Sequence, residues 1–488
     1  MHSPAAATRK ARWIVLALGG ALLVLAGLLL ARSRAAPAFR GPARHVIFIS
    51  LDTTRADHMG FYGAGWMRTP RLDALVAESI ILDDYMTVAT TTLASHTSLM
   101  TGKYPQAHGV PRNGFMVPAD NVMLAETLRA AGFRTAGVLG SFALDSRFDF
   151  AQGFEHFDEQ FDTLVGEGGA DQNQRDAAAV TDAVIGYLGA RPASDNLFLF
   201  VHYFDPHWPY AAPAPYDQMY SPDNGGAGLP IEEHPALRLA PRDAQTRRQL
   251  AAYAGEVSYL DAQVGRLLDD LRRRGILDEA LLVVTSDHGE NLTENWGRPF
   301  DHGWSVYQIE QRAIGLIRLP GAARAGARVS QLVASIDMAP TVLRYLGLPP
   351  PQGADGVALD LARLELVRPV EFRFGEASKP WEQVETDPRW FNLRKPRCVR
   401  SGSFKYIRTG YLNREELYDL DRDPYEQRNL LPAPAEDVGA VADRLRAALD
   451  EFDRAAAPPA TRFESSQREE TLRRLKALGY LGGSESSP

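Results

Sequence analysis

Acidic and imidazole side chains follow three apolar segments of the chain, close to the point where each segment ends. They are Asp52 after HVIFISL, His207 after NLFLFVHY, and Asp287 with His288 after LLVVT. A lone aspartate in such a place is commonly a helix cap or a turn former. Three such places together favour a shared site for a divalent cation, and nitrogen donors favour zinc or manganese over calcium. Asp52, Asp287 and His288 are therefore candidate ligands, and His302 in FDHG offers another nitrogen.

A second candidate site is the hydroxyl-rich segment 90–102, TTTLASHTSLMTG. Hydroxyl residues that turn into an apolar run are typical of a helix N-terminus. The free N–H groups and the dipole at such an end favour an anion, although ordinary Ser/Thr capping predicts the same pattern without a ligand. Lys103 follows directly and offers a cation for ester oxygens, with an exposed lysine of no special role as the alternative.

Strand-like and helix-like segments alternate after residue 44. Short apolar, β-branched runs typical of buried strands are residues 45–51, 135–139, 196–203, 281–285 and 314–319. Amphipathic stretches between them are residues 121–131, 171–188 and 247–274. This alternation predicts an α/β fold with a mostly parallel sheet between helices. Such folds bind ligands at the carboxyl ends of their strands, where the candidate ligands stand.

Composition excludes several classes of protein. The chain has 488 residues, a formal net charge of −8 and one cysteine, Cys398. One cysteine permits no internal disulfide and no thiolate metal cluster. The acidic balance argues against a nucleic-acid partner, because nucleic-acid binding needs a dense positive field. The length suffices for one large domain or for two to three smaller ones.

Residues 13–31, WIVLALGGALLVLAGLLLA, carry no charge and have basic residues on both sides. At about 1.5 Å per residue the run nearly crosses a hydrocarbon core of about 30 Å. It predicts a transmembrane anchor, with a cytoplasmic tail at 1–12 and a linker at 32–44. A cleaved signal peptide and a secreted protein are the alternative. The first interpretation predicts a single-pass protein of a bacterial-type cell membrane whose remaining chain is extracytoplasmic.

Five blocks of the chain, in order, resemble the sulfatase family of the alkaline phosphatase superfamily. They are HVIFISLDTTRADHMG (45–60), the segment 92–105 ending in SLMTGKYP, TSDHGE (285–290), IDMAPTVLRYLGLPPP (336–351), and FKYIR with ELYDLDRDPYEQRNL (404–430). The resemblance implies a sulfatase-like catalytic domain at 45–365, a smaller C-terminal α+β subdomain at 366–432 and a helical tail at 433–488. It also implies Asp52, Asp287 and His288 as metal ligands. Thr92 takes the nucleophile position, where it would also bind the metal.

The chain departs from cysteine-type sulfatases at the residues that define them. Those enzymes use a cysteine, oxidised to formylglycine, in a Cys-x-Pro-x-Arg motif, and the aligned residues here are Thr92, Ala94 and His96. A threonine cannot form the aldehyde hydrate, so no formylglycine is expected. A threonine nucleophile with these ligands is similar to phosphoethanolamine transferases and lipoteichoic acid synthase, which handle phosphate. The departures therefore favour a phosphate-type ester.

Together these patterns predict a membrane-anchored, metal-dependent hydrolase of sulfate or phosphate esters, with a lipid head group or a glycan as possible alcohol portion. Thr92 is expected to attack the ester, and His207 or His302 to protonate the leaving alcohol. His96, which replaces the motif arginine, is expected either to contact the substrate or to support the Thr92 loop, and Lys103 is expected to contact the ester oxygens. A phosphoethanolamine- or phosphoglycerol-type transferase and an inactive binding protein of the same fold are the alternatives. The sequence predicts no oligomeric state.

Overall fold

The computed structural model describes residues 41–161, 173–192, 195–221, 226, 228–230, 243–294, 299–379, 394–431, 436–455, 463 and 468–480. The chain divides into two units, Met1–Phe39 and Arg40–Pro488, and every described residue belongs to the second. The expected membrane anchor at 13–31 lies outside the described residues. Among the helices within those ranges, none has the length and hydrophobicity of a membrane span.

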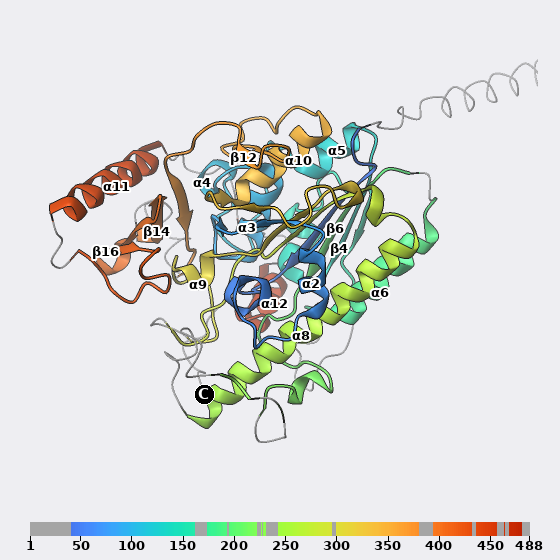
Figure 1. Cartoon of the computed structure of the whole chain (residues 1–488), viewed down its shortest axis with the longest axis horizontal. Coiled ribbons are helices and arrows are strands. Elements are labelled where there is room, and N and C mark those ends of the chain that lie inside the picture. The colour runs from blue at the N-terminus through green and yellow to red at the C-terminus, as the bar shows by residue number, and fades with distance from the viewer. Residues whose placement is uncertain are drawn as a thin grey trace, which may run out of the picture. The chain divides into compact units, whose positions relative to one another are not determined.

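An eight-stranded sheet lies at the centre of the second unit (Figure 1), in the order β5-β4-β6-β1-β7-β8-β2-β9. Its strands are β1 (His45–Leu51), β2 (Ile80–Leu82), β4 (Arg134–Leu139), β5 (His156–Asp158), β6 (Leu197–Tyr203), β7 (Ala280–Thr285), β8 (Gly315–Arg318) and β9 (Arg328–Val329). The run from β5 to β7 is parallel, whereas β8 is antiparallel to both β7 and β2. This confirms the predicted α/β fold with a mostly parallel sheet.

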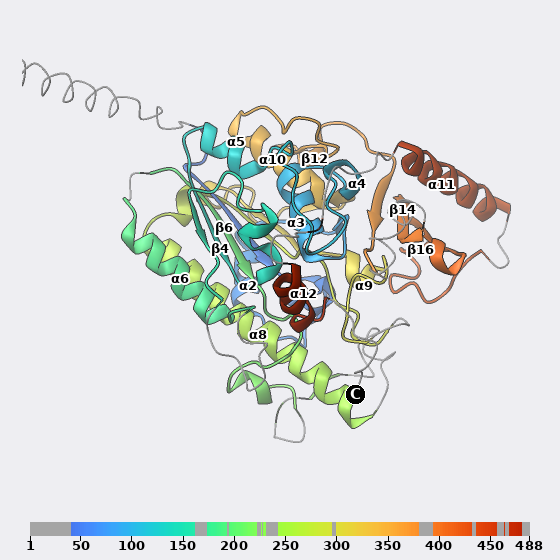
Figure 2. The same ribbon diagram turned by 180° about the vertical axis from the view of Figure 1, so that it is seen from behind.

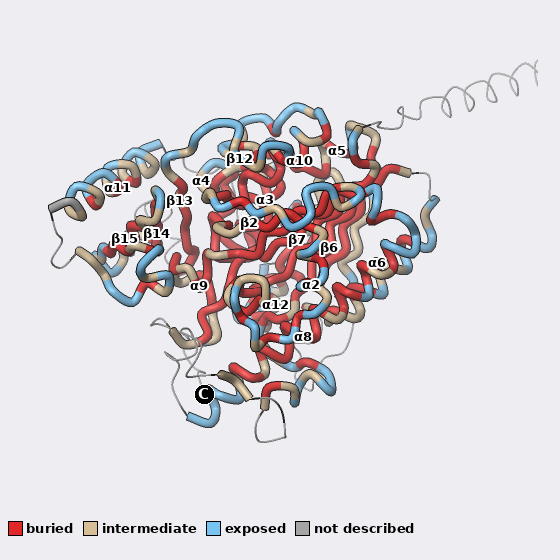
Figure 3. The backbone as a smooth tube through the Cα atoms, viewed as in Figure 1, coloured by how far each residue is buried: buried red, intermediate tan, exposed pale blue. Residues whose placement is uncertain are grey.

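Helices cover both faces of this sheet, as the two opposite views show (Figures 1 and 2). One face carries α2 (Pro70–Val76), α6 (Ala177–Ala190) and α8 (Ala244–Arg273); the other carries α3 (Thr92–Thr101), α4 (Pro105–His108), α5 (Leu124–Ala130) and α10 (Met338–Leu346). Side chains of β1 alternate between the faces, as the pleat requires. Ile49 joins the apolar cluster that contains α8, and Ser50 bonds to His96 of α3. Figure 3 shows that the strands between these layers are buried.

A second, antiparallel sheet follows in the order β13 (Arg373–Glu376), β14 (Pro396–Ser401), β15 (Phe404–Thr409) and β16 (Arg414–Asp419). Helix α11 (Glu436–Ala455) packs on it through an apolar cluster that includes Leu445 and Leu449. The smaller elements are β3 (Tyr85–Met86) paired with β10 (Val333–Ala334), β11 (Leu359–Asp360) paired with β12 (Glu365–Leu366), and α9 (Gln308–Gln311).

The last helix, α12 (Arg468–Ala477), lies apart from α11, beside the large sheet and its helices (Figure 2). Its Arg474 donates from Nε to Asn173 Oδ1 at 2.7 Å and places its guanidinium 3.8 Å from the ring centroid of Phe142. The two helices of the predicted tail therefore pack in different places: α11 lies on the small sheet and α12 on the large domain.

Phe452 of α11 connects the small sheet to the large domain. Its ring stacks on Phe374 of β13 with centroids 4.0 Å apart, and it meets Tyr104, which follows α3, at 5.1 Å. We expect Phe452→Ala to lower the free energy of unfolding by about 2 kcal/mol, because a half-buried aromatic loses both contacts. Urea denaturation measures this change. The neighbouring exposed Glu451→Ala should stay within about 0.5 kcal/mol of the unmodified protein, and equal losses in both variants would contradict the bridging role.

Candidate active site

Three of the predicted ligands meet where the central strands end. Asp52 directly follows β1, and Asp287 and His288 follow β7, which pairs with β1 in parallel. Because parallel neighbours end at the same edge of a sheet, the side chains emerge side by side. Their ligand atoms all lie within 4.8 Å of one another, and all three residues are buried.

The free atoms of this cluster fit a divalent cation. Asp52 Oδ1, Asp287 Oδ2 and His288 Nε2 have no hydrogen-bond partner among the described residues. His288 Nδ1 lies 2.9 Å from the carbonyl of Gly289 and donates to it, so Nε2 keeps its lone pair and faces Asp287 Oδ2 at 3.3 Å. Two acceptors that face each other require a cation or a proton between them. Burial and the Asp287 carboxylate also raise the pKa of Asp52, which a bound cation would offset.

Backbone geometry holds the cluster in place. Asp287 Oδ1 accepts hydrogen bonds from the N–H groups of His288 at 2.8 Å and Thr53 at 3.2 Å. Thr53 has a φ of 49°, a left-handed conformation that is costly for a β-branched residue. His202, near the end of β6, lies with Nε2 3.0 Å from Asp52 Oδ2. The arrangement therefore orients both carboxylates and leaves one oxygen of each free.

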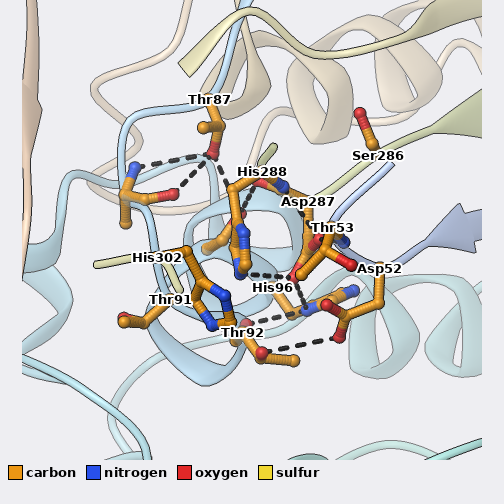
Figure 4. A network of polar contacts seen from close by, with 12 residues as sticks. Asp52, Thr53, Thr87, Thr91, Thr92, His96, Ser286, Asp287, His288 and His302 are labelled. Atoms are coloured by element: carbon orange, nitrogen blue, oxygen red, sulfur yellow. Dashed lines mark hydrogen bonds and ion pairs between the residues drawn. The ribbon is translucent and has the colours of Figure 1, made fainter. Parts of the chain in front are cut away.

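Thr92 is the first residue of α3 and lies beside this cluster (Figure 4). Its hydroxyl donates to Asp52 Oδ2 across a long 3.5 Å contact. The N-terminal end of the helix dipole favours negative charge at this position. The first-turn N–H of Leu93 is already bonded to Asn113 Oδ1 at 2.7 Å, so a neighbouring side chain occupies part of the predicted anion site.

His96 lies one turn further along α3, behind Thr92. Its Nδ1 donates to the Thr92 carbonyl at 2.7 Å, and its Nε2 accepts from the Ser50 hydroxyl at 2.8 Å. Burial lowers the pKa of His96 to about 3, so the ring is neutral. With both nitrogens engaged, His96 supports the turn that carries Thr92 and leaves no ring atom for the expected substrate contact.

Lys103 lies away from the site, contrary to the sequence-based expectation. Gly102, with a φ of 70°, ends α3 and turns the chain, so Lys103 lies at the opposite end of the helix from Thr92. Its Nζ donates to Asn121 Oδ1 at 3.0 Å. The cation beside the site is Lys379, which follows β13, forms an ion pair with Asp301, and helps to lower the pKa of His302.

His302 and His207 border the cluster. The His302 ring centroid lies 4.4 Å from that of His288 and 5.1 Å from that of His207. Nε2 of His302 and of His207 lack a partner among the described residues. His207 Nδ1 donates to the Trp208 carbonyl at 2.6 Å, and burial lowers the pKa of His207 to about 3. His207 therefore presents a lone pair in the free protein, and it must gain a proton before it can act as an acid.

Beyond His207 a cavity of about 190 Å³ is lined by Asp205, Glu256, Tyr259 and Arg175, among others. Glu256 Oε1 accepts from the Ala211 N–H at 2.6 Å. Burial raises the pKa of both Asp205 and Glu256, and a neighbouring carboxylate adds to the effect at each, Asp176 for Asp205 and Asp205 for Glu256. His207 itself lines this cavity, so the cavity adjoins the candidate site.

Sequence reasoning missed three buried side chains of the site. They are His202 on β6, Glu290 beside His302, and Tyr480 after α12. His202 was detectable as the one imidazole in an otherwise apolar strand. The residues around Tyr480 do not predict its place in the site. Its hydroxyl lies 2.9 Å from Thr92 Oγ, and Thr92 is 388 positions away in the sequence.

Cys398 lies on β14 of the C-terminal sheet, where its Sγ donates to Gln311 Oε1 at 3.1 Å. It is fully buried, and burial raises the pKa of its thiol. Cys398 is therefore no candidate for the nucleophile, and Thr92 remains the residue predicted for that role.

Two family models match the chain. Residues 44–348 match the model of the sulfatase family, and residues 297–455 match the model of the C-terminal region of N-sulphoglucosamine sulphohydrolase. An ulvan-active sulfatase of Formosa agariphila is 27% identical over 411 residues, which cover 80% of this chain and 77% of that protein. The multifunctional alkaline phosphatase superfamily protein PehA of Trinickia caryophylli is 26% identical over 486 residues, covering 80% of this chain and 92% of that protein.

Solved structures share the fold. A phosphonate monoester hydrolase from Silicibacter pomeroyi superposes with a TM-score of 0.68 at 24% identity, covering 85% of this chain and 96% of that chain. A phosphonate monoester hydrolase of Agrobacterium radiobacter gives 0.66 at 22% identity, with 84% and 96% covered. Since the sulfatase model spans more than half of its length, the chain belongs to the sulfatase family of the alkaline phosphatase superfamily and is a hydrolase of sulfuric or phosphoric esters.

Proposed function

We propose that this protein is a metal-dependent hydrolase that uses Thr92 as its nucleophile and prefers phosphate-type esters to sulfates. One observation carries the proposal. The Thr92 hydroxyl is buried at the N-terminus of α3, beside Asp52, and Asp52 belongs to a cluster of three ligands with free coordinating atoms. A threonine in place of an oxidisable cysteine supports the preference for phosphate, because it cannot form the aldehyde hydrate of cysteine-type sulfatases.

A divalent cation held by Asp52, Asp287 and His288 would lower the pKa of the Thr92 hydroxyl and offset charge on the ester oxygens. Thr92 gives up its hydroxyl proton to solvent by way of Asp52 Oδ2, to which it already donates, and its Oγ forms a bond to phosphorus. The bond from phosphorus to the alcohol oxygen breaks, and that oxygen takes a proton from His302 or His207, once that histidine has taken up a proton from solvent. Water then cleaves the threonyl ester and restores the Thr92 hydroxyl.

The remaining charge on the transferred group meets two favourable partners. The N-terminus of α3 directs its dipole at this position, and Lys379 adds a cation beside His302. The cavity beyond His207 offers the carboxyl groups of Asp205 and Glu256 as acceptors for hydroxyl groups. These acceptors support a substrate whose alcohol portion carries several hydroxyl groups, such as a glycan. The similarity to an ulvan-active sulfatase supports the same substrate class.

We further propose that residues 13–31 anchor the protein in a bacterial-type membrane, with the catalytic domain outside the cytoplasm. The uncharged run and its basic flanks support this location. Fractionation of the full-length protein after washing with carbonate tests it, since a peripheral protein would be released and an anchored one retained.

We expect Thr92→Ala to reduce turnover by about three orders of magnitude or more, because the bond-forming oxygen is lost. Turnover is measured with p-nitrophenyl phosphate, p-nitrophenyl sulfate and bis(p-nitrophenyl) phosphate in the presence of Zn²⁺, Mn²⁺ or Ca²⁺. Activity on sulfate alone would contradict the preference for phosphate.

Thr97→Ala is the matched control for this substitution. Thr97 lies on the same helix, is equally buried, and donates only within the helix, to the Leu93 carbonyl at 2.7 Å. It should keep turnover within a few-fold of the unmodified protein. A metal-loaded Thr92→Ala protein that remains as active as Thr97→Ala would exclude Thr92 as the nucleophile.

Metal removal should abolish hydrolysis, and Zn²⁺ or Mn²⁺ should restore it better than Ca²⁺, because the cluster offers an imidazole nitrogen. A metal that binds only the folded state stabilises it by about 2.7 kcal/mol at a hundredfold excess over its Kd. The unfolding temperature of metal-free protein should therefore rise on addition of metal. Asp287→Asn should lose this rise, and Asp269→Asn, a half-exposed carboxylate on α8, should keep it. An equal rise in both variants would disprove the ligand assignment.

A further inference from the structure

The C-terminal segment of the chain reaches the proposed nucleophile. After α12 the chain turns at Gly479, which has a φ of 78°, and Tyr480 points into the site. Its hydroxyl lies 2.9 Å from Thr92 Oγ, and its ring centroid lies 5.4 Å from that of His207 and 5.9 Å from that of His302. Tyr480 is only 1% exposed.

Several contacts hold this segment in place, so Tyr480 is not a loose chain end. Besides the bond from Arg474 to Asn173, the Tyr480 N–H donates to the Leu475 carbonyl at 2.9 Å and closes the turn. Leu475 is fully buried and packs so closely on Gly114 that a Cβ there would lie 2.8 Å from Leu475 Cδ1. These contacts therefore fix the side chain of Tyr480 beside Thr92.

The direction of the hydrogen bond follows from the neighbouring group. A carboxylate that binds a metal is ionised and only accepts, so in the metal-loaded protein the contact between Thr92 and Asp52 uses the Thr92 proton. Thr92 has one proton, and the bond to Tyr480 must then use the tyrosine proton. The tyrosine O–H therefore donates to Thr92 Oγ, the atom that would form and break the covalent bond.

We propose that Tyr480 is a catalytic residue, supplied by the C-terminal segment, that stabilises Thr92 Oγ as it leaves phosphorus in the second half of the reaction. The proposal rests on Thr92 being the nucleophile. In that step a water oxygen bonds to phosphorus, and the bond between Oγ and phosphorus breaks with its electron pair remaining on Oγ. The water proton ends on Oγ, and the tyrosine keeps its own proton while donating a hydrogen bond. A donor aimed at a developing alkoxide acts as an oxyanion hole does.

A blocking role for the same tyrosine predicts the opposite kinetics. If Tyr480 only covered Thr92 and excluded substrate, its removal would raise turnover. The hydrogen bond favours the catalytic role, because the side chain presents to Oγ the one atom that can donate a proton and places its ring against His207 and His302.

Tyr480→Phe in the full-length, metal-loaded protein tests the proposal. We expect kcat to fall by about 10- to 100-fold, with breakdown of the threonyl ester slowed more than its formation. With p-nitrophenyl phosphate this produces a burst of p-nitrophenol followed by a slow phase. Phosphorylated Thr92 should accumulate in the variant after acid quenching, as detected by peptide mass spectrometry. Unchanged or increased turnover without a burst would overturn the proposal.

Tyr203→Phe is the matched control. Its hydroxyl also pairs with a threonine, Thr181, at 2.8 Å, and both residues are fully buried between β6 and α6. Both variants lose a hydrogen bond of the same kind, so similar losses of stability are expected, but Tyr203→Phe should show no burst. Inactivity of Thr92→Ala together with normal kinetics of Tyr480→Phe would refute the role of Tyr480 alone. Full activity of Thr92→Ala would refute the nucleophile itself.

Discussion

Two carboxylates buried side by side are the constraint on which the site depends. The parallel pairing of β1 with β7 brings Asp52 and Asp287 together without contact with solvent, an arrangement that is costly unless positive charge or donors compensate. The surrounding structure supplies part of this compensation. Backbone N–H groups of Thr53 and His288 bind one oxygen of Asp287, and His202 binds one oxygen of Asp52. The strained φ of Thr53 is the cost of directing its N–H to Asp287. One oxygen of each carboxylate remains without a partner among the described residues, and a divalent cation held there would supply the compensating charge.

The histidines around these carboxylates differ in what their two ring nitrogens contact, and these contacts determine the role that each ring can take. His96 has both nitrogens engaged and serves as a support for Thr92. His207 has Nδ1 bound to a carbonyl, and its Nε2 has no partner among the described residues, so Nε2 presents a lone pair. Burial keeps both rings neutral by lowering their pKa. In the proposed mechanism, His207 must therefore gain a proton before it can protonate a leaving alcohol, and His207 also lines the cavity.

The sequence predicts those parts of the site that depend on local pattern. A buried strand followed by polar residues is a local signal, and it predicted β1 and β7 and the closeness of the three candidate ligands that follow them. The prediction for Lys103 failed because spacing along a helix does not say which end faces the site, and Gly102 places Lys103 at the far end of α3. Segment 314–319 forms β8, but its antiparallel direction depends on how the chain returns to the sheet. Lys379 and Tyr480 come from segments whose position is set only by tertiary packing.

A threonine nucleophile raises a difficulty that the position of Tyr480 resolves. The oxygen that attacks phosphorus must later leave it, and an alkoxide of an aliphatic alcohol is a poor leaving group unless a donor or cation stabilises it. That help must come from a group in contact with Oγ. Among the described residues, the hydrogen-bond contacts of Thr92 Oγ are Asp52, which accepts, and Tyr480, which donates. In the proposed mechanism, the ligand cluster activates Thr92 for attack, and the C-terminal segment supplies the donor that stabilises Oγ when it leaves phosphorus.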